Sequence, residues 1–125
     1  MTRNYDPRAE ILWSGTDDWV SLAEAAAIVA DERAAASEDI RSETLDILAG
    51  LLRADLIQAG EVMGGFRPWG VSPDDALSKL FERWTEPSQP LSPLDGTWFA
   101  NTPAGDALAH ELADAGLTSR PGDAN

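Results

Sequence analysis

The sequence predicts an α+β domain that is mostly helical. Several segments repeat apolar residues at the three- and four-residue spacing of amphipathic helices, whereas 56–62 and 97–101 are short and typical of strands. Of the 125 residues, 43% are hydrophobic, and twenty of these are alanines, each of which buries little surface. We therefore expect a modest helical core, closed as one domain over residues 1–117 and followed by a flexible tail over 118–125.

Polar residues in capping positions mark the starts of four predicted helices. The pairs are Asp6 with Pro7, Ser21 with Glu24 at the spacing of a capping box, Ser72 with Pro73, and Thr102 with Pro103. The predicted helices run over 7–13, 22–34 and 38–54, and two more begin at Pro73 and Pro103. Gly15 is expected to end the first helix, and Trp19 and Val20 are expected to be extended.

Each predicted helix after the first carries an apolar face. These faces are Leu22, Ala25, Ala26 and Val29; then Ile40, Thr44, Ile47, Leu48, Leu51 and Leu52; then Ala76, Leu77, Leu80, Phe81 and Trp84; and finally Ala104, Leu108, Leu112 and Ala115. Between them, residues 66–70 are expected to be irregular. A loop with three prolines follows the fourth helix: Pro87, Pro90 and Pro93.

Two pieces of the chain resemble parts of a winged helix-turn-helix domain. Residues 51–61, Leu-Leu-Arg-Ala-Asp-Leu-Ile-Gln-Ala-Gly-Glu, look like the end of a recognition helix that runs into the first wing strand. Residues 98–109 look like the second wing strand entering a closing helix, as in many bacterial winged-helix regulators. The resemblance implies a three-helix core, a two-stranded wing, a helical insertion over 63–95 between the wing strands, and a C-terminal helix.

The charge of the chain argues against a nucleic-acid ligand. Nine Lys and Arg residues stand against 22 Asp and Glu residues, a formal net charge of −13. In winged-helix regulators the helix that matches 38–54 faces the major groove, but here it combines two arginines with a majority of acids. Phosphate is repelled by such a helix, and a long insertion in place of a short basic wing tip does not fit a minor groove.

We therefore interpret the chain as a non-enzymatic protein-interaction module. Its binding surface is expected to combine acidic side chains of the third helix with two residues of the insertion: Glu38, Asp39, Glu43, Asp46, Arg67 and Trp69. An acidic surface of this kind is complementary to a basic protein partner. A homodimer is compatible with the same residues.

Two other functions stay open. In a dimeric DNA-binding transcriptional regulator, pairing of two chains would collect scattered arginines into one basic patch: Arg33, Arg41, Arg53 and Arg67. In a small-ligand-binding protein, aromatic rings would frame a groove: Phe66, Trp69, Phe81, Trp84, Trp98 and Phe99. The competing interpretation of these rings is that they fill a core that is otherwise rich in alanine.

Signals for catalysis, metals and membranes are weak. The chain has no cysteine, and its one histidine, His110, has Asp114 four residues on but no further ligand at metal-binding spacing. Phosphate-binding glycine loops and serine–histidine motifs are also missing. We therefore expect no enzymatic activity, no cofactor and no metal. No apolar run has the roughly 18–20 residues of a membrane span, and no signal-peptide stretch follows Met1, which predicts a cytoplasmic protein without membrane contacts.

Overall fold

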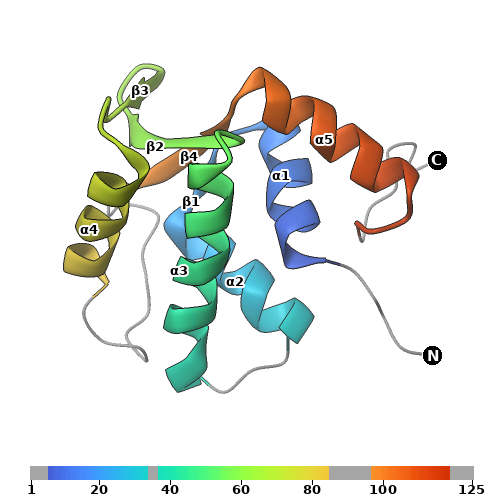
Figure 1. Cartoon of the computed structure of the whole chain (residues 1–125), viewed down its shortest axis with the longest axis horizontal. Helices are drawn as coiled ribbons and strands as arrows, with labels where there is room; N and C mark the ends of the chain where they lie inside the picture. Colours follow the sequence, from blue (N-terminus) through green and yellow to red (C-terminus); the bar gives the residue numbers. More distant parts are fainter. Residues whose placement is uncertain (1–5, 34–36, 85–96, 119–125) are drawn as a thin grey trace.

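The computed structural model describes residues 6–33, 37–84 and 97–118, with the side chains of 31–33 and 37–39 excepted. These residues form an α+β fold in which helices predominate, as the sequence predicts (Figure 1). The helices are α1 (Pro7–Asp17), α2 (Leu22–Arg33), α3 (Ser37–Arg53), α4 (Pro73–Arg83) and α5 (Pro103–Asp114). The strands are β1 (Val20–Ser21), β2 (Ile57–Val62), β3 (Phe66–Pro68) and β4 (Trp98–Asn101).

The four strands form one antiparallel sheet in the order β1-β4-β2-β3. The central strand β4 places Phe99 opposite both Val20 of β1 and Ala59 of β2. All three side chains are buried, so this row marks the face of the sheet that joins the core. Helices α1 and α3 pack near this sheet, α4 lies along α3, and α5 packs on α1 (Figure 1).

The segment 66–70, which we expected to be irregular, begins with strand β3. It pairs with the last three residues of β2 across a tight connection. Gly64 and Gly65 supply this connection with φ angles of +72° and +154°, which residues with a side chain rarely adopt. Phe66–Pro68 is too short a segment, and ends in a residue too unfavourable in strands, for the sequence to predict a strand there. The strand is identified only by its pairing with β2. The insertion over 63–95 thus starts as a hairpin and continues into α4; its predicted proline loop lies outside the described residues.

Hydrogen bonds of the caps confirm the four predicted helix starts. Asp6 Oδ1 accepts from Arg8 N, Ser21 Oγ from Glu24 N, Ser72 Oγ from Asp75 N and Thr102 Oγ1 from Gly105 N, all at 3.0 to 3.1 Å. Each side chain satisfies an N–H group that the first helical turn leaves without a partner. The predicted bounds of α2 and α3 agree with the structure to within one residue.

The first helix is longer than predicted, because Gly15 lies inside α1 and does not end it. Asn101 at the end of β4 packs against this glycine and donates from Nδ2 to the main-chain carbonyl of Leu12 at 2.8 Å. A Cβ atom at position 15 would overlap the Asn101 amide. The close approach of α1 and β4 therefore requires glycine at position 15. The residues around Gly15 in the sequence do not predict this approach, because Asn101 is distant in the chain.

Replacing Gly15 with alanine is expected to lower the free energy of unfolding by about 1–3 kcal/mol, because the new methyl group overpacks the contact with Asn101. Gly50→Ala is the matched control, since Gly50 is an exposed residue of α3 with open space at its Cβ position. That change should raise the free energy of unfolding by about 1 kcal/mol through helix propensity. Urea titration of both variants checks the opposite signs, and equal signs would contradict the packing.

One residue of the predicted α4 face lies outside the core. Ala76, Leu77, Leu80 and Trp84 are buried as predicted, whereas Phe81 is 50% exposed. Its ring lies under the Arg41 guanidinium, 5.0 Å from the ring centre. The helical spacing of Phe81 suits the core face, but α3 covers only part of α4 and leaves this ring at the edge.

The buried stripe of α5 also differs from the predicted face. Gly105, Ala109 and Ala113 are buried, whereas Leu108 and Leu112 are half-buried and both predicted alanines, Ala104 and Ala115, are exposed. Small residues four apart let the helix approach its neighbours closely, and a Cβ atom added at Gly105 would overlap the main-chain oxygen of Leu56. The packing therefore follows the smallest side chains and not the most apolar ones.

The tail predicted over 118–125 is described only at its first residue, Thr118. Thr118 is only 3% exposed, and the carbonyl of Leu117 accepts a hydrogen bond from Asp6 N at 3.0 Å. This contact joins the residue before Thr118 to the start of α1. Residues 119–125 lie outside the described residues.

Buried side chains from all five helices and from strands β1, β2 and β4 contribute to the hydrophobic interior. Its largest fully buried side chains are Trp84 of the α4 end and Phe99 of β4. In the part of the chain that the structure describes, no helix combines the length and apolar character needed to cross a membrane.

Candidate functional site

Helix α4 engages both of the α3 arginines that we assigned to a DNA contact. Arg53 donates from Nη2 and Nε to Asp74 Oδ1 at 2.9 and 3.3 Å. Arg41 donates from Nε to the main-chain carbonyl of Trp84 while its guanidinium covers the Phe81 ring. The Arg53 pair is exposed and stabilises the fold little. Both cations nevertheless have partners within the chain, which lowers what they can offer to phosphate.

Within a single chain, the described arginines that we assigned to a DNA contact do not form one basic patch. Arg41 and Arg53 are twelve residues apart on α3, which separates them by about 18 Å along the helix. Arg67 is exposed on β3, where its Nε donates to the carbonyl of Met63 at 3.3 Å. The side chain of Arg33 lies outside the described ones.

The predicted acidic surface is described only in part. Asp46 is exposed on α3, and Glu43, three residues before it on the same side of the helix, is half-buried. The side chains of Glu38 and Asp39 lie outside the described ones. The described part of α3 therefore presents one fully exposed carboxylate of the predicted four.

Trp69 packs against α4 beneath two cations. Lys79 Nζ and the Arg83 guanidinium lie 4.9 and 5.3 Å from its ring centre, one helical turn apart. The ring is half-buried, and its Nε1 is buried without a hydrogen-bond partner. This placement packs the β3–α4 connection against the core. It leaves little exposed surface of the Trp69 ring for a partner to contact.

A different group of aromatic residues lies on the sheet face that points away from the core. We call Trp19, Phe66 and Trp98 the sheet patch. Successive side chains of a strand point to opposite faces of the sheet. Because Phe99 points into the core, its neighbour Trp98 points to the outer face. Phe66 reaches the Cβ position of Gly60, and its ring centre is 6.4 Å from that of Trp19, which is 37% exposed. The patch is bordered by the exposed carboxylates of Asp17 and Asp18 at the end of α1.

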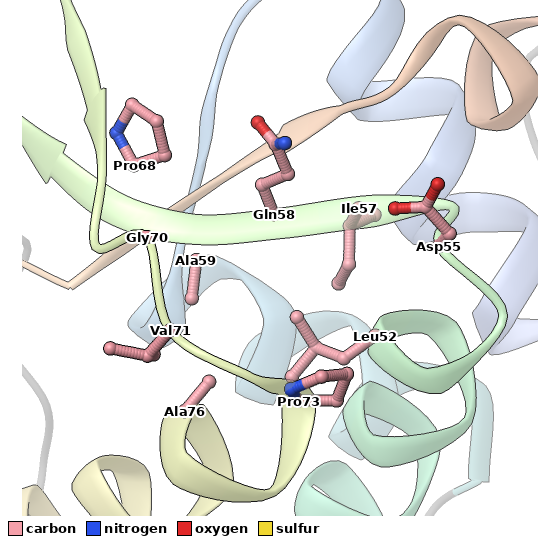
Figure 2. Close-up of a pocket in the computed structure, with 10 residues that line it drawn as sticks. All are labelled: Leu52, Asp55, Ile57, Gln58, Ala59, Pro68, Gly70, Val71, Pro73 and Ala76. Atoms are coloured by element: carbon pink, nitrogen blue, oxygen red, sulfur yellow. The ribbon is translucent and has the colours of Figure 1, made fainter.

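A pocket of about 140 Å³ lies where the end of α3, the first half of β2 and the start of α4 meet. Figure 2 shows β2 along the pocket, with Ile57 and Ala59 on the same side of the strand as Leu52 and Ala76. Gln58 points the opposite way, and Asp55 sits at the end of the strand with its carboxylate turned back toward Ile57 (Figure 2). Four further residues complete the lining or its rim: Pro68, Gly70, Val71 and Pro73.

Asp55 adopts a backbone conformation that usually belongs to glycine. Its φ is +60°, and the main chain around it closes α3 with hydrogen bonds from Asp55 N to Leu52 O and from Leu56 N to Leu51 O. This is the bond pattern of a helix end at which glycine is the usual left-handed residue. An aspartate there costs stability, and such costs concentrate at functional positions.

Asp55→Gly is expected to raise the free energy of unfolding by about 0.5–1 kcal/mol, because glycine adopts the left-handed conformation without strain. The matched control is Asp46→Gly, the same exchange at an exposed position inside α3. There glycine should lower the free energy of unfolding by about 0.5–1 kcal/mol. Denaturant unfolding compares the two, and a loss of stability in both variants would count against the strain at Asp55.

His110 makes a ring contact and does not point to a metal site. It is exposed on α5, edge-on to Trp13 with ring centres 5.2 Å apart. Among the described residues, no three side chains of His, Asp or Glu gather closely enough to hold an ion. We therefore assign it no chemistry.

Sequence reasoning named Phe66 and Trp98 among the rings of a possible groove but did not connect them with Trp19, and it missed the pocket. Trp19 and Phe66 are far apart in the sequence, and only the sheet order brings their rings together. For the pocket one local signal was available: the α3 pattern ends at Arg53-Ala54-Asp55-Leu56, with aspartate where a helix end favours glycine. Comparison of the chain with known protein families, with curated proteins and with solved structures finds no match.

Proposed function

We propose that the chain is a non-enzymatic protein-interaction module on a winged-helix-like scaffold, and that the sheet patch is its contact surface. The order α1-β1-α2-α3-β2 followed by β4 and α5 supports the scaffold, because β4 pairs with β2 as a second wing strand would. In this arrangement β3 and α4 are the insertion between the two wing strands.

The proposal rests on one observation, the aromatic residues on the outer face of the sheet. Two tryptophans and a phenylalanine on one surface supply the kind of rigid, amphipathic contact area that dominates protein interfaces. Asp17 and Asp18 at the border, together with the net charge of −13, favour a partner that is basic around an apolar centre.

Affinity capture with the full chain as bait tests this surface. The wild type is compared with Trp19→Ser and with Phe81→Ser, a control that removes an exposed aromatic ring from α4 instead. We expect proteins held by the wild type and by the control to be lost from the Trp19 variant, and to be released as salt screens the acidic border. Capture that is equal for all three baits contradicts the proposed surface, as does a strictly monomeric chain that retains nothing.

The alternative, a dimeric DNA-binding regulator, receives less support. It requires Arg41 and Arg53 to leave their partners on α4 and to face phosphate. A gel-shift titration with genomic DNA fragments at low salt separates the two functions. Binding at micromolar protein that Arg53→Gln weakens would favour the regulator, whereas we expect no shifted band.

A further inference from the structure

The pocket beside Asp55 combines an apolar wall with hydrogen-bond acceptors. Leu52, Ile57 and Ala76 supply apolar surface, and the Asp55 carboxylate stands at one end of it, whereas the Gln58 side chain points to the other side of β2 (Figure 2). Among the described residues, neither polar side chain makes a hydrogen bond or an ion pair. Asp55 is the one ionisable residue of the ten that line the pocket.

The backbone of β2 adds a further acceptor. Strand β3 pairs with β2 only over its last three residues, and Trp69 N donates to the carbonyl of Ala59 at 3.0 Å. The chain then turns away at Gly70, with a φ of +70°, toward α4. Main-chain groups facing one edge recur at every second residue, so the carbonyl of Ile57 faces the same edge, where no described strand pairs with it.

The charges around the pocket favour a cation. Arg53 and Asp74, the sequence neighbours of the lining residues Leu52 and Pro73, pair with each other at 2.9 Å. Among the described residues, the Asp55 carboxylate of the lining is in no ion pair. The pocket is much smaller than the roughly 300–1,000 Å³ of sites for drug-sized ligands. One extended side chain with an apolar stem and a cationic end fits this volume and this chemistry.

We propose that this pocket receives an alkyl-guanidinium group, presented as an arginine side chain of the protein partner; the identity of that carrier rests on the proposed function. The stem of arginine lies against Leu52 and Ile57, and its planar group of five N–H donors meets the Asp55 carboxylate and the Ile57 carbonyl. This contact gives a role to the aspartate at position 55, where glycine would suit the left-handed backbone better.

Titration of the full chain with Nα-acetyl-arginine methylamide, followed by amide NMR, tests the pocket without any partner. The lysine and norleucine analogues are the matched probes. We expect saturable shifts of the Ile57, Gln58 and Val71 amides in the millimolar range for arginine, weaker ones for lysine and none for norleucine. Asp55→Asn, which keeps the left-handed backbone accessible, should weaken arginine binding about 5–10-fold. Asp114→Asn, with the same change in net charge at an exposed position of α5, should leave it unchanged.

Several outcomes overturn the proposal. Equal binding of norleucine removes the role of the cation, and an unchanged affinity in Asp55→Asn removes the role of the carboxylate. Absence of shifts at the pocket amides removes the site. Because the titration needs no partner, its failure alongside intact Trp19-dependent capture overturns the pocket alone. Arginine binding without such capture overturns the sheet patch and keeps the guanidinium site.

Discussion

Trp84→Ala is expected to lower the free energy of unfolding by about 3–5 kcal/mol, the usual range for removing a buried aromatic side chain. Trp84 is 2% exposed and ends α4, where its N–H donates to the carbonyl of Leu80 at 3.0 Å. Its own carbonyl accepts from Arg41 of α3. Truncation therefore opens a cavity between α4 and the rest of the core. Urea unfolding followed by circular dichroism measures the change.

Phe81→Ala is the control for this experiment. The ring is three residues before Trp84 but 50% exposed, so its loss should cost less than about 1 kcal/mol, mostly from the contact with Arg41. If the two variants unfold at the same urea concentration, Trp84 is not a core residue and α4 is an appendage. A large difference makes α4 an integral part of the domain.

Gly105→Ala should lower the free energy of unfolding by about 3 kcal/mol, the upper end of overpacking effects. The added Cβ would overlap the main-chain oxygen of Leu56, and this oxygen is held in place by a hydrogen bond from Thr102 N at 3.0 Å. Backbone cannot move aside as a flexible side chain can. Thermal and urea unfolding of the variant both report the loss.

The sign of the stability change in Gly105→Ala distinguishes overpacking against Leu56 from the helix propensity of alanine. Helix propensity alone predicts that alanine in place of glycine stabilises α5 by about 1 kcal/mol. Ala107→Ser, which adds one heavy atom at an exposed position of the same helix, should stay within about 0.5 kcal/mol of the wild type. A Gly105→Ala protein that is more stable than the wild type would show that α5 does not approach Leu56 as closely as described.

Local chemistry made much of the fold predictable. The caps at Asp6, Ser21, Ser72 and Thr102 involve partners two or three residues away, so the sequence carries all of their information. Amphipathic spacing likewise located α2, α3 and α4, because burial of one helix face requires that spacing. What these signals cannot specify is which surface of a neighbouring element each face meets.

The candidate site depended on contacts between distant segments. Arg41 and Arg53 carried the DNA hypothesis as isolated charges, and their partners on α4 come from residues 21 to 43 positions away. Trp69 stood out as an aromatic residue in irregular chain, yet α4 covers it with two cations. The rings of the sheet patch meet only because the strand order places β1 and β3 on either side of β4 and β2.

By itself the sequence determined the class of the fold, the starts of the helices and the acidity of the surface, because these follow from residues a few positions apart and from composition. The tertiary structure alone decided that Gly15 lies within a helix, that residues 66–68 form a strand and that Asp55 borders a pocket. Each of these depends on a close approach between distant segments. Steric fit and strand pairing across such contacts outweigh the preference of any single residue.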